Sequence, residues 1–255
     1  MNPQGKPLFS IITITFNAGE TIVPTIESLN RQSFQDFEHI IIDGASSDNT
    51  LARIRELSNS TPRILSEPDN GLYFAMNKGL NIAKGKYLLF LNAGDSLHSP
   101  DSLRYYADAS ANDPDIIYAD TNIVNEDRTF NSPRHLSAPE VLTLKSFSKG
   151  MLICHQAFMV KRSIAPLYDT DYRFSADYDW TVRCIAASSP EKCINLHKVT
   201  IDYLRNGTTD KNKRASLIER FHIMSHHYGS LPTIARHLSF IPRAATRRLK
   251  AILQR

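Results

Sequence analysis

The stretch KYLLFLNAGDS, residues 86–96, decides the fold class. Its residues 87–91 form a continuous apolar run, which is typical of a strand buried on both faces of a parallel sheet. The run ends in a polar segment that contains Gly94 and Asp95. In open α/β sheets ligands bind at the carboxyl ends of the strands, so an acid placed here could hold a metal ion on a phosphorylated ligand. Taken alone, Gly94-Asp95 also fits a simple turn.

Strand and helix patterns alternate on the N-terminal side of this stretch. Strands are predicted at residues 9–16, 37–43 and 63–66. Helices are predicted around Ile22, Ile26 and Leu29, and at residues 50–57 and 73–83. This alternation predicts a doubly wound, mostly parallel sheet flanked by helices.

The pattern changes on the C-terminal side, where the connections are shorter. Strands are predicted at residues 115–120, 122–125, 158–160 and 193–204, which indicates a mixed sheet. Helices are predicted at residues 138–145, 176–187 and 211–228, with a basic helix near the end. No internal repeat and no long linker divides the chain.

The composition is that of an ordinary globular protein, with 255 residues, 42% of them hydrophobic and 22% charged. No apolar run approaches the roughly 18 residues needed to span a membrane, and the N-terminus does not resemble a signal peptide. The three cysteines are odd in number and lack CxxC spacing, which indicates a reducing cytosol and no structural zinc. We therefore expect a cytoplasmic protein.

The formal charge of +4 is unevenly distributed along the chain. No acid follows Glu219, whereas seven of the 30 basic residues do, which leaves 23 bases against 26 acids in the rest. A nucleic-acid-binding protein would carry positive charge on its main folded face. We therefore expect no nucleic-acid partner.

Two common nucleotide-binding motifs are absent. No two glycines are separated by a single residue, so the G-x-G-x-x-G fingerprint of dinucleotide-binding folds is missing. The segment GLNIAKGK imitates a phosphate-binding loop, but Gly79 and Gly85 are one residue too far apart, and Tyr87 replaces the required Ser or Thr.

Acids and amides follow successive predicted strands. Asn17 ends the first strand, Asp43 the second, Glu67 and Asp69 follow the third, and Asp95 follows the fourth. In a parallel sheet these ends meet along one crevice. Such a series favours a functional site over a set of unrelated turn residues.

Together these motifs resemble glycosyltransferase family 2, the inverting enzymes of GT-A fold, over about residues 8–210. The motifs that carry the resemblance are SIITITFN, IIIDGASSDNT, SEPDNGLYFAMNKGLNIAKGKYLLFLNAGD, CHQAFMVKR and FSADYDWTVR. The resemblance implies a Rossmann-like GT-A domain at 1–210, with a nucleotide-sugar half at 1–95 and an acceptor half at 96–210. A basic helical extension would follow at 211–255. The branch most resembled is the bacterial one that builds capsular polysaccharide, exopolysaccharide and lipopolysaccharide.

The resemblance implies the following roles for residues of the first half. Asp95 matches the acid of the family's D-x-D motif and would bind Mg²⁺ or Mn²⁺, although Asn92 and Gly94 stand at positions often held by acids. The metal would then rest on one carboxylate and on diphosphate oxygens. The residues expected to bind the nucleotide sugar are Thr15, Asn17, Asp43, Glu67, Asp69, Lys78 and Asn92.

In the second half, the family's Glu-Asp pair is reduced to Ala176-Asp177. Asp177 resembles the catalytic base that removes the acceptor proton, and it also fits the first turn of a helix, where the macrodipole favours an acid. Asp179 is the second choice for the base and is expected to point elsewhere on the helix. Other candidate acceptor contacts are His155, Gln156 and Trp180, although a packed core position is the favoured interpretation of His155 and of Trp180.

The function implied is a metal-dependent, inverting transfer of sugar from a nucleotide sugar, with UDP-sugars favoured, to a lipid-linked or growing polysaccharide acceptor. A sugar-phosphate nucleotidyltransferase and an inactive sugar-nucleotide-binding protein are the alternatives. The nucleotidyltransferase would need a Gly-rich basic loop after the first strand, and TFNAGET does not supply one.

Residues 233–255 contain no acid, so they form either a packed final helix or an interfacial helix on the anionic inner face of the plasma membrane.

Overall fold

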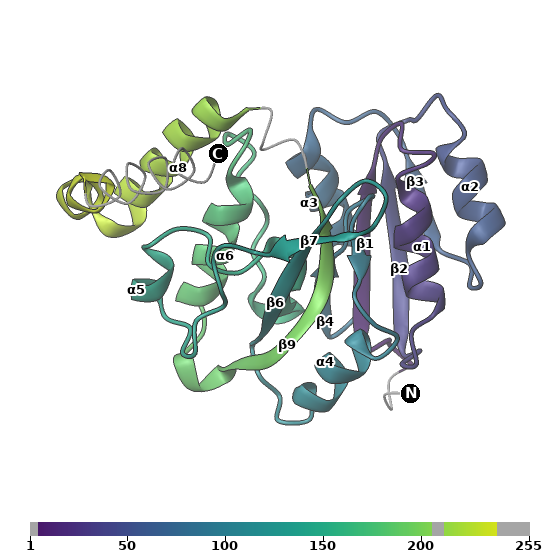
Figure 1. Ribbon diagram of the computed structural model, residues 1–255, viewed down its shortest axis with the longest axis horizontal. Helices are drawn as coiled ribbons and strands as arrows, with labels where there is room; N and C mark the ends of the chain where they lie inside the picture. Colours follow the sequence, from purple (N-terminus) through teal and green to yellow (C-terminus); the bar gives the residue numbers. More distant parts are fainter. Residues whose placement is uncertain (1–4, 206–211, 239–255) are drawn as a thin grey trace, which may run out of the picture.

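The computed structural model describes residues 5–205 and 212–238 (Figure 1). Strands and helices alternate through the first 90 residues, as predicted. These elements are β1 (Phe9–Thr15), α1 (Ile22–Asn30), β2 (Phe37–Asp43), α2 (Thr50–Leu57), β3 (Arg63–Ser66), α3 (Leu72–Ile82) and β4 (Tyr87–Phe90).

The second half has shorter strands and irregular connections. Its elements are β5 (Ser96–Leu97), α4 (Ser102–Ser110), β6 (Ile116–Val124), β7 (Phe130–Pro133), α5 (Leu144–Phe147), β8 (Phe158–Lys161), α6 (Ala176–Ala186), β9 (Cys193–Leu204) and α8 (Lys213–Tyr228). Single 3₁₀ turns occur at His155–Ala157, Arg162–Ile164 and Pro190–Lys192, and residues 230–238 form a further helix.

One sheet joins the two halves in the order β3-β2-β1-β4-β8-β6-β9-β5, with β7 paired to β6. The four strands β3, β2, β1 and β4 are mutually parallel, whereas β8 is antiparallel to both of its neighbours. The mixed sheet expected from the sequence is therefore confirmed. Because β1 to β4 are parallel, their carboxyl ends lie at the same edge of the sheet.

Alternate residues of the central strands face two apolar layers, as the period of a strand requires. Ile12 and Phe90 pack on one face with α3 and α6, in a core cluster that includes Tyr73 and Trp180. The other face carries residues such as Leu89, which pack with α1 and α4. Near-continuous burial of β1 and β4 follows from this double covering.

Two predictions for the second half were wrong. The strands expected at 115–120 and 122–125 are a single strand, β6, whose pairing with β9 shifts register in its middle. The helix expected at 138–145 is confined to α5. The preceding segment is tied to β6, because Ala138 N–H donates to Asp120 and the Tyr118 hydroxyl donates to the Pro139 carbonyl, at 3.0 and 2.9 Å.

The C-terminal region is helical as far as the structure describes it. The helix predicted at 211–228 is observed from Lys213, and α8 lies beside α6 in Figure 1. Most of the segment 233–255, including Pro242 and the basic residues beyond it, is outside the described residues. Within the described residues, no helix combines the length and the apolar character needed to cross a membrane.

Candidate active site

The carboxyl ends of β1 to β4 bring the predicted polar residues together, and we call this set the carboxyl edge. It consists of Thr15, Asn17, Asp43, Glu67, Asp69, Asn92 and Asp95. Strand register places Thr15 beside Asp43, and Asp43 beside Ser66. The convergence predicted from the sequence is therefore confirmed in geometry.

Asp43 is fully buried, and its carboxylate organises the loops at the carboxyl edge. It accepts hydrogen bonds from the Ser46 backbone N–H at 3.0 Å and from the Ser66 hydroxyl at 2.6 Å. Asn17 joins the adjacent loop, because its side-chain oxygen accepts from Ser47 N–H at 2.9 Å and its own N–H donates to Ser46. Asn17 has a left-handed backbone with φ of 46°, which asparagine tolerates better than most residues.

Among the residues that the structure describes, two buried oxygen atoms at the carboxyl edge have no hydrogen-bond partner. They are Oγ1 of Thr15 and Oδ1 of Asn92. Thr15 ends β1, and Asn92 follows the neighbouring strand, where the Ala93 N–H bonds to the Ile14 carbonyl at 3.3 Å. An unpaired buried polar group costs about 1–3 kcal/mol, so this pair of atoms at adjacent strand ends indicates a place for a ligand.

The loop after β3 carries an ion-pair cluster. The Lys78 ammonium bonds to Glu67 at 2.8 Å and also to Asp69. Desolvation opposes the charge on Lys78, but hydrogen bonds from the ammonium to Asp69 and Glu67 outweigh it and raise the pKa of Lys78. A Cβ atom at Gly44 would lie 3.5 Å from Asp69 Oδ2, so this cluster adjoins the loop after β2.

Asp95 is buried, with only 5% of its surface exposed. Its carboxylate accepts from the Gln156 side-chain amide at 2.8 Å and from the Leu204 N–H at 2.9 Å. Burial raises its pKa to about 7, against the opposing effects of Leu204, Arg128 and Gln156. Because burial disfavours the charge on Asp95, a cation that binds this carboxylate stabilises its ionised form.

Asp95 and Asn92 supply oxygen atoms of the kind that bind a divalent cation, but they do not form a complete site by themselves. Mg²⁺ and Mn²⁺ accept all-oxygen coordination, and the unpaired Asn92 oxygen is a further oxygen ligand three residues before Asp95. The described residues contain no group of three or more His, Cys, Asp or Glu side chains that could hold a metal ion. The fit therefore requires further oxygen atoms from a ligand, such as a diphosphate.

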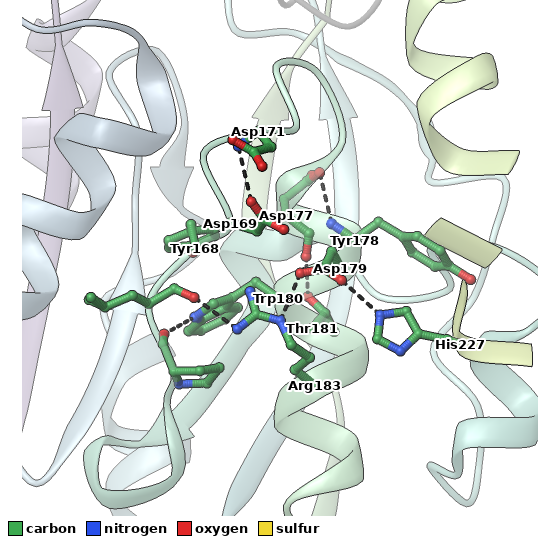
Figure 2. Close-up of polar contacts among 12 residues, drawn as sticks. Tyr168, Asp169, Asp171, Asp177, Tyr178, Asp179, Trp180, Thr181, Arg183 and His227 are labelled. Carbon is green, nitrogen blue, oxygen red and sulfur yellow. Dashed lines mark hydrogen bonds and ion pairs between the residues drawn. The ribbon is translucent and has the colours of Figure 1, made fainter. Parts of the chain in front are cut away.

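Asp177 lies in the first turn of α6 and is half-buried. Its Oδ1 atom accepts from its neighbour's backbone, Tyr178 N–H, at 2.9 Å (Figure 2) and from the Tyr73 hydroxyl at 3.3 Å. Tyr73 belongs to α3, directly after the loop that carries Asp69. The hydroxyl of Tyr73 therefore links the carboxyl edge to the first turn of α6.

Asp179 points to another side of α6, as predicted. Its two oxygens bond to Arg183 Nε and His227 Nε2, both at 2.7 Å (Figure 2). Burial alone would raise the pKa of Asp179, but the hydrogen bonds from His227 and Arg183 prevail and lower it. Both oxygens of this carboxylate are held by hydrogen bonds and its pKa is lowered, which makes it a poor base.

The three candidate acceptor contacts lie in the core. Trp180 is 1% exposed, donates its indole N–H to the Pro166 carbonyl at 2.7 Å and stacks on Tyr168. His155 lies 2.6 Å from the Tyr168 hydroxyl, and burial lowers its pKa to about 4, so it is neutral at pH 7. Gln156 instead holds Asp95.

Sequence reasoning missed several residues that organise these positions. Arg128, on the turn between β6 and β7, donates to the Gly94 carbonyl at 2.7 Å and to the Ser96 hydroxyl at 2.5 Å. The Tyr73 hydroxyl donates to Asp177, and the Leu204 N–H donates to Asp95; each bond joins residues more than 100 positions apart. No local pattern in the sequence marks such partners.

Comparison with known proteins decides the family. The sequence profile described as glycosyl transferase family 2 matches residues 10–166, which are 157 of the 255 residues. The chain belongs to glycosyl transferase family 2. A relative from Mycobacterium bovis (strain BCG / Pasteur 1173P2), named PGL/p-HBAD biosynthesis glycosyltransferase, is 33% identical over 223 residues, covering 82% of this chain and 83% of the relative.

Solved structures of other proteins share the fold of this family 2 chain. Residues 1–349 of TarS from S. aureus, in complex with UDP-GlcNAc, align with a TM-score of 0.71 at 18% identity, covering 91% of this chain and 73% of that TarS chain. Glucosyl-3-phosphoglycerate synthase from Mycobacterium tuberculosis, in complex with Mn²⁺, UDP and glucosyl-3-phosphoglycerate, aligns with a TM-score of 0.62 at 13% identity over 89% of this chain and 81% of the synthase. The GT-A type fold expected from the sequence is confirmed.

Proposed function

We propose that this family 2 glycosyltransferase moves a sugar from a nucleotide-sugar donor to a lipid-linked or growing polysaccharide acceptor, with inversion at the anomeric carbon. The donor would lie along the carboxyl edge in the half formed by residues 1–95. The acceptor would approach through the half formed by residues 96–210. Thr15, Asn17 and Asp43 would hold the base and ribose, and Glu67, Asp69 and Lys78 would line the donor pocket.

The observation that carries this proposal is the pair of unpaired buried oxygens, Thr15 Oγ1 and Asn92 Oδ1, at adjacent ends of β1 and β4. Around them the carboxyl edge is already organised by internal hydrogen bonds, so a donor would meet a preformed set of polar groups. Preformed sites with a few convergent polar groups are typical of small-molecule binding. The UDP and UDP-sugar complexes of TarS and of the mycobacterial synthase support a uridine nucleotide, although a further structural neighbour, the mannosyltransferase PcManGT, holds GDP-Man.

In the reaction, the acceptor hydroxyl oxygen forms a bond to the anomeric carbon as the bond from that carbon to the phosphate oxygen breaks. Asp177 takes the hydroxyl proton, and the bonding electron pair leaves with the nucleoside diphosphate. Asp95 and Asn92 would hold Mg²⁺ or Mn²⁺, which when bound supplies positive charge for the departing diphosphate. The Mn²⁺ in the mycobacterial synthase supports a role for a divalent cation.

The product released distinguishes this function from its alternatives. Incubation with a panel of nucleotide sugars, Mn²⁺ and a saccharide acceptor should yield free nucleoside diphosphate. A sugar-phosphate nucleotidyltransferase would instead yield pyrophosphate from a nucleoside triphosphate and a sugar phosphate. An inactive binder would yield neither, although it would still be stabilised by the nucleotide, by about 2.7 kcal/mol at 100 times its dissociation constant.

The C-terminal region is proposed to hold the enzyme on the anionic inner face of the plasma membrane, near a lipid-linked acceptor. Among the described residues, Leu231, Ile234 and Leu238 are 82%, 44% and 60% exposed, at a spacing that shares one side of the helix 230–238. The sequence beyond them adds five basic residues and no acid. Each basic residue near an anionic surface contributes about 1 kcal/mol.

Vesicle sedimentation tests this location. The full chain should bind anionic vesicles, should bind neutral vesicles weakly and should be released by salt. A chain that ends at Ile241 should lose binding and keep transfer to an acceptor without lipid. Retained binding of that shorter chain would show that the basic segment is not responsible.

A further inference from the structure

The helix α8 contacts the segment that leads into α6 through one carboxylate. Glu219 accepts hydrogen bonds from three consecutive backbone N–H groups: Arg173 at 2.9 Å, Phe174 at 2.7 Å and Ser175 at 3.0 Å. Hydrogen bonds to a charged acceptor are about twice as strong as those between neutral groups. Glu219 therefore fixes the path of the backbone two residues before Asp177.

This contact replaces the ordinary cap of a helix. A residue such as Ser175, at the N-cap of α6, usually accepts from N–H groups of its own helix. Here the Ser175 side chain makes no such bond and lies instead 2.9 Å from the Ser216 hydroxyl of α8. The carboxylate of Glu219 also lies near the positive end of the α6 dipole, which favours a negative charge.

A second contact fixes the other side of the same turn. His227, two turns further along α8 than Glu219, bonds to Asp179 at 2.7 Å (Figure 2). Between them, Ile223 and Met224 are buried in the cluster that contains Tyr178 and Trp180. Asp177 is thus carried by a turn that α8 holds on both sides, while its own carboxylate faces Tyr73.

Glu219 is the one acidic residue in the described segment 212–238. Glu219 is the last acidic residue in the sequence. It also lies outside residues 10–166, the segment that the family profile matches. Its role cannot be read from the family motifs and depends on the packing of α8 against α6.

We propose that Glu219 is a positioning residue for Asp177, so that α8 is a working part of the acceptor half. Glu219 touches neither donor nor acceptor and acts by orienting the first turn of α6. The proposal rests on the proposed function, in which Asp177 is the base. It predicts that loss of Glu219 slows the transfer step while the carboxyl edge still binds the donor.

Single variants of Glu219, followed by a double-mutant cycle with Asp177, separate the positioning role of Glu219 from a general loss of structure. Glu219→Ala should lower kcat by about 10²-fold, the effect of a misplacement of roughly 1 Å, and leave donor affinity and the number of donor sites per chain unchanged. Glu219→Gln, which keeps one acceptor oxygen, should lie between Glu219→Ala and the native protein. The control Glu191→Gln, an exposed acid at the far end of α6, should have native kcat.

Because Glu219 acts through Asp177, Glu219→Ala should add little further loss of kcat when Asp177 is already Asn. Two results would overturn the proposal. One is a full additional loss of kcat in the double variant. The other is a fall in kcat that merely follows a fall in the number of donor sites.

Hydrogen exchange tests the same positioning without any activity. In Glu219→Gln and Glu219→Ala, the amides of residues 173–180 should exchange faster than in the native protein, while those of β1 to β4 keep their rates. Unchanged exchange at 173–180 overturns the positioning role even if transfer is observed. Faster exchange in a protein that releases no nucleoside diphosphate would instead place the failure in the proposed function.

Discussion

The carboxyl edge and the first turn of α6 are held in different ways, with Asp95 as the exception on the carboxyl edge because its partners Gln156 and Leu204 lie 61 and 109 residues away. At the carboxyl edge most polar side chains are held by nearby residues, as Asp43 is held by Ser46, or by loops of adjacent parallel strands, as Asn17 is held by Ser47. The first turn of α6 is held by Tyr73, Glu219 and His227, which lie between 44 and 104 residues away in sequence. Under the proposed function, we therefore expect donor binding to persist when the support of Asp177 is lost.

The largest effect is expected at Asp95, on the carboxyl edge. Asp95→Asn should reduce transfer to background, because the single carboxylate that fits a divalent cation is removed. The fold should persist, since the Asn oxygen can still accept from Leu204 N–H and Gln156 can turn its amide. Initial rates of nucleoside diphosphate release, with Mn²⁺ and with chelator, measure the effect. Native rates in this variant, or full activity of the native protein in chelator, would remove Asp95 from its metal role.

A smaller loss is expected at Asp177, on the first turn of α6. Asp177→Asn should lower kcat by roughly 10²–10⁴-fold, which is typical of a lost general base. Asp179→Asn is the matched control on the same helix. It should weaken the contact with Arg183 and His227, lower thermal stability and retain more activity than Asp177→Asn. The reverse ranking of the two variants in kcat would make Asp179 the base.

The smallest effect is expected on the free energy of unfolding, at two buried histidines, one in β2 and one beside Trp180 of α6. Burial lowers the pKa of His39 in β2 and of His155 beside Trp180 to about 4. Between about pH 6.5 and 4 the unfolded chain binds protons at these positions and the folded chain does not. The free energy of unfolding should therefore fall as the pH is lowered through this window, by up to about 3 kcal/mol for each histidine.

Denaturant unfolding at pH 7 and pH 4.5 measures this dependence. His39→Gln, whose amide can still donate to Thr13, should reduce the loss of stability on acidification. His222→Gln, at an exposed position of α8, should leave it unchanged. An equal pH dependence in His39→Gln and the native protein would contradict the assignment to His39.

The difference between the two regions also explains what the sequence could predict. The strand KYLLFLNAGDS, the parallel sheet and the convergence of Asp43, Asp69 and Asp95 follow from local patterns, because each polar residue directly follows an apolar run. The supports of Asp177 and Asp95 could not be predicted this way. Glu219 and Leu204 meet their partners only through tertiary packing, which leaves no periodic signal in the sequence.

The errors have the same origin. The helix expected at 138–145 has suitable residues, but Asp120 and Tyr118 of β6 hold its first residues in an irregular path. Tertiary hydrogen bonds of this kind override local propensity. The roles of the predicted site residues, in contrast, remain predictions that the variants above would test.

The most direct test of the account is the donor affinity of Asp95→Asn and Asp177→Asn, measured side by side by calorimetric titration with UDP and with a UDP-sugar in the presence of Mn²⁺. The account predicts that Asp95→Asn loses the Mn²⁺-dependent part of binding, whereas Asp177→Asn binds the donor with native affinity and fails only in turnover. Equal losses of donor affinity in both variants, or native affinity in Asp95→Asn, would contradict the division of work between the carboxyl edge and the first turn of α6.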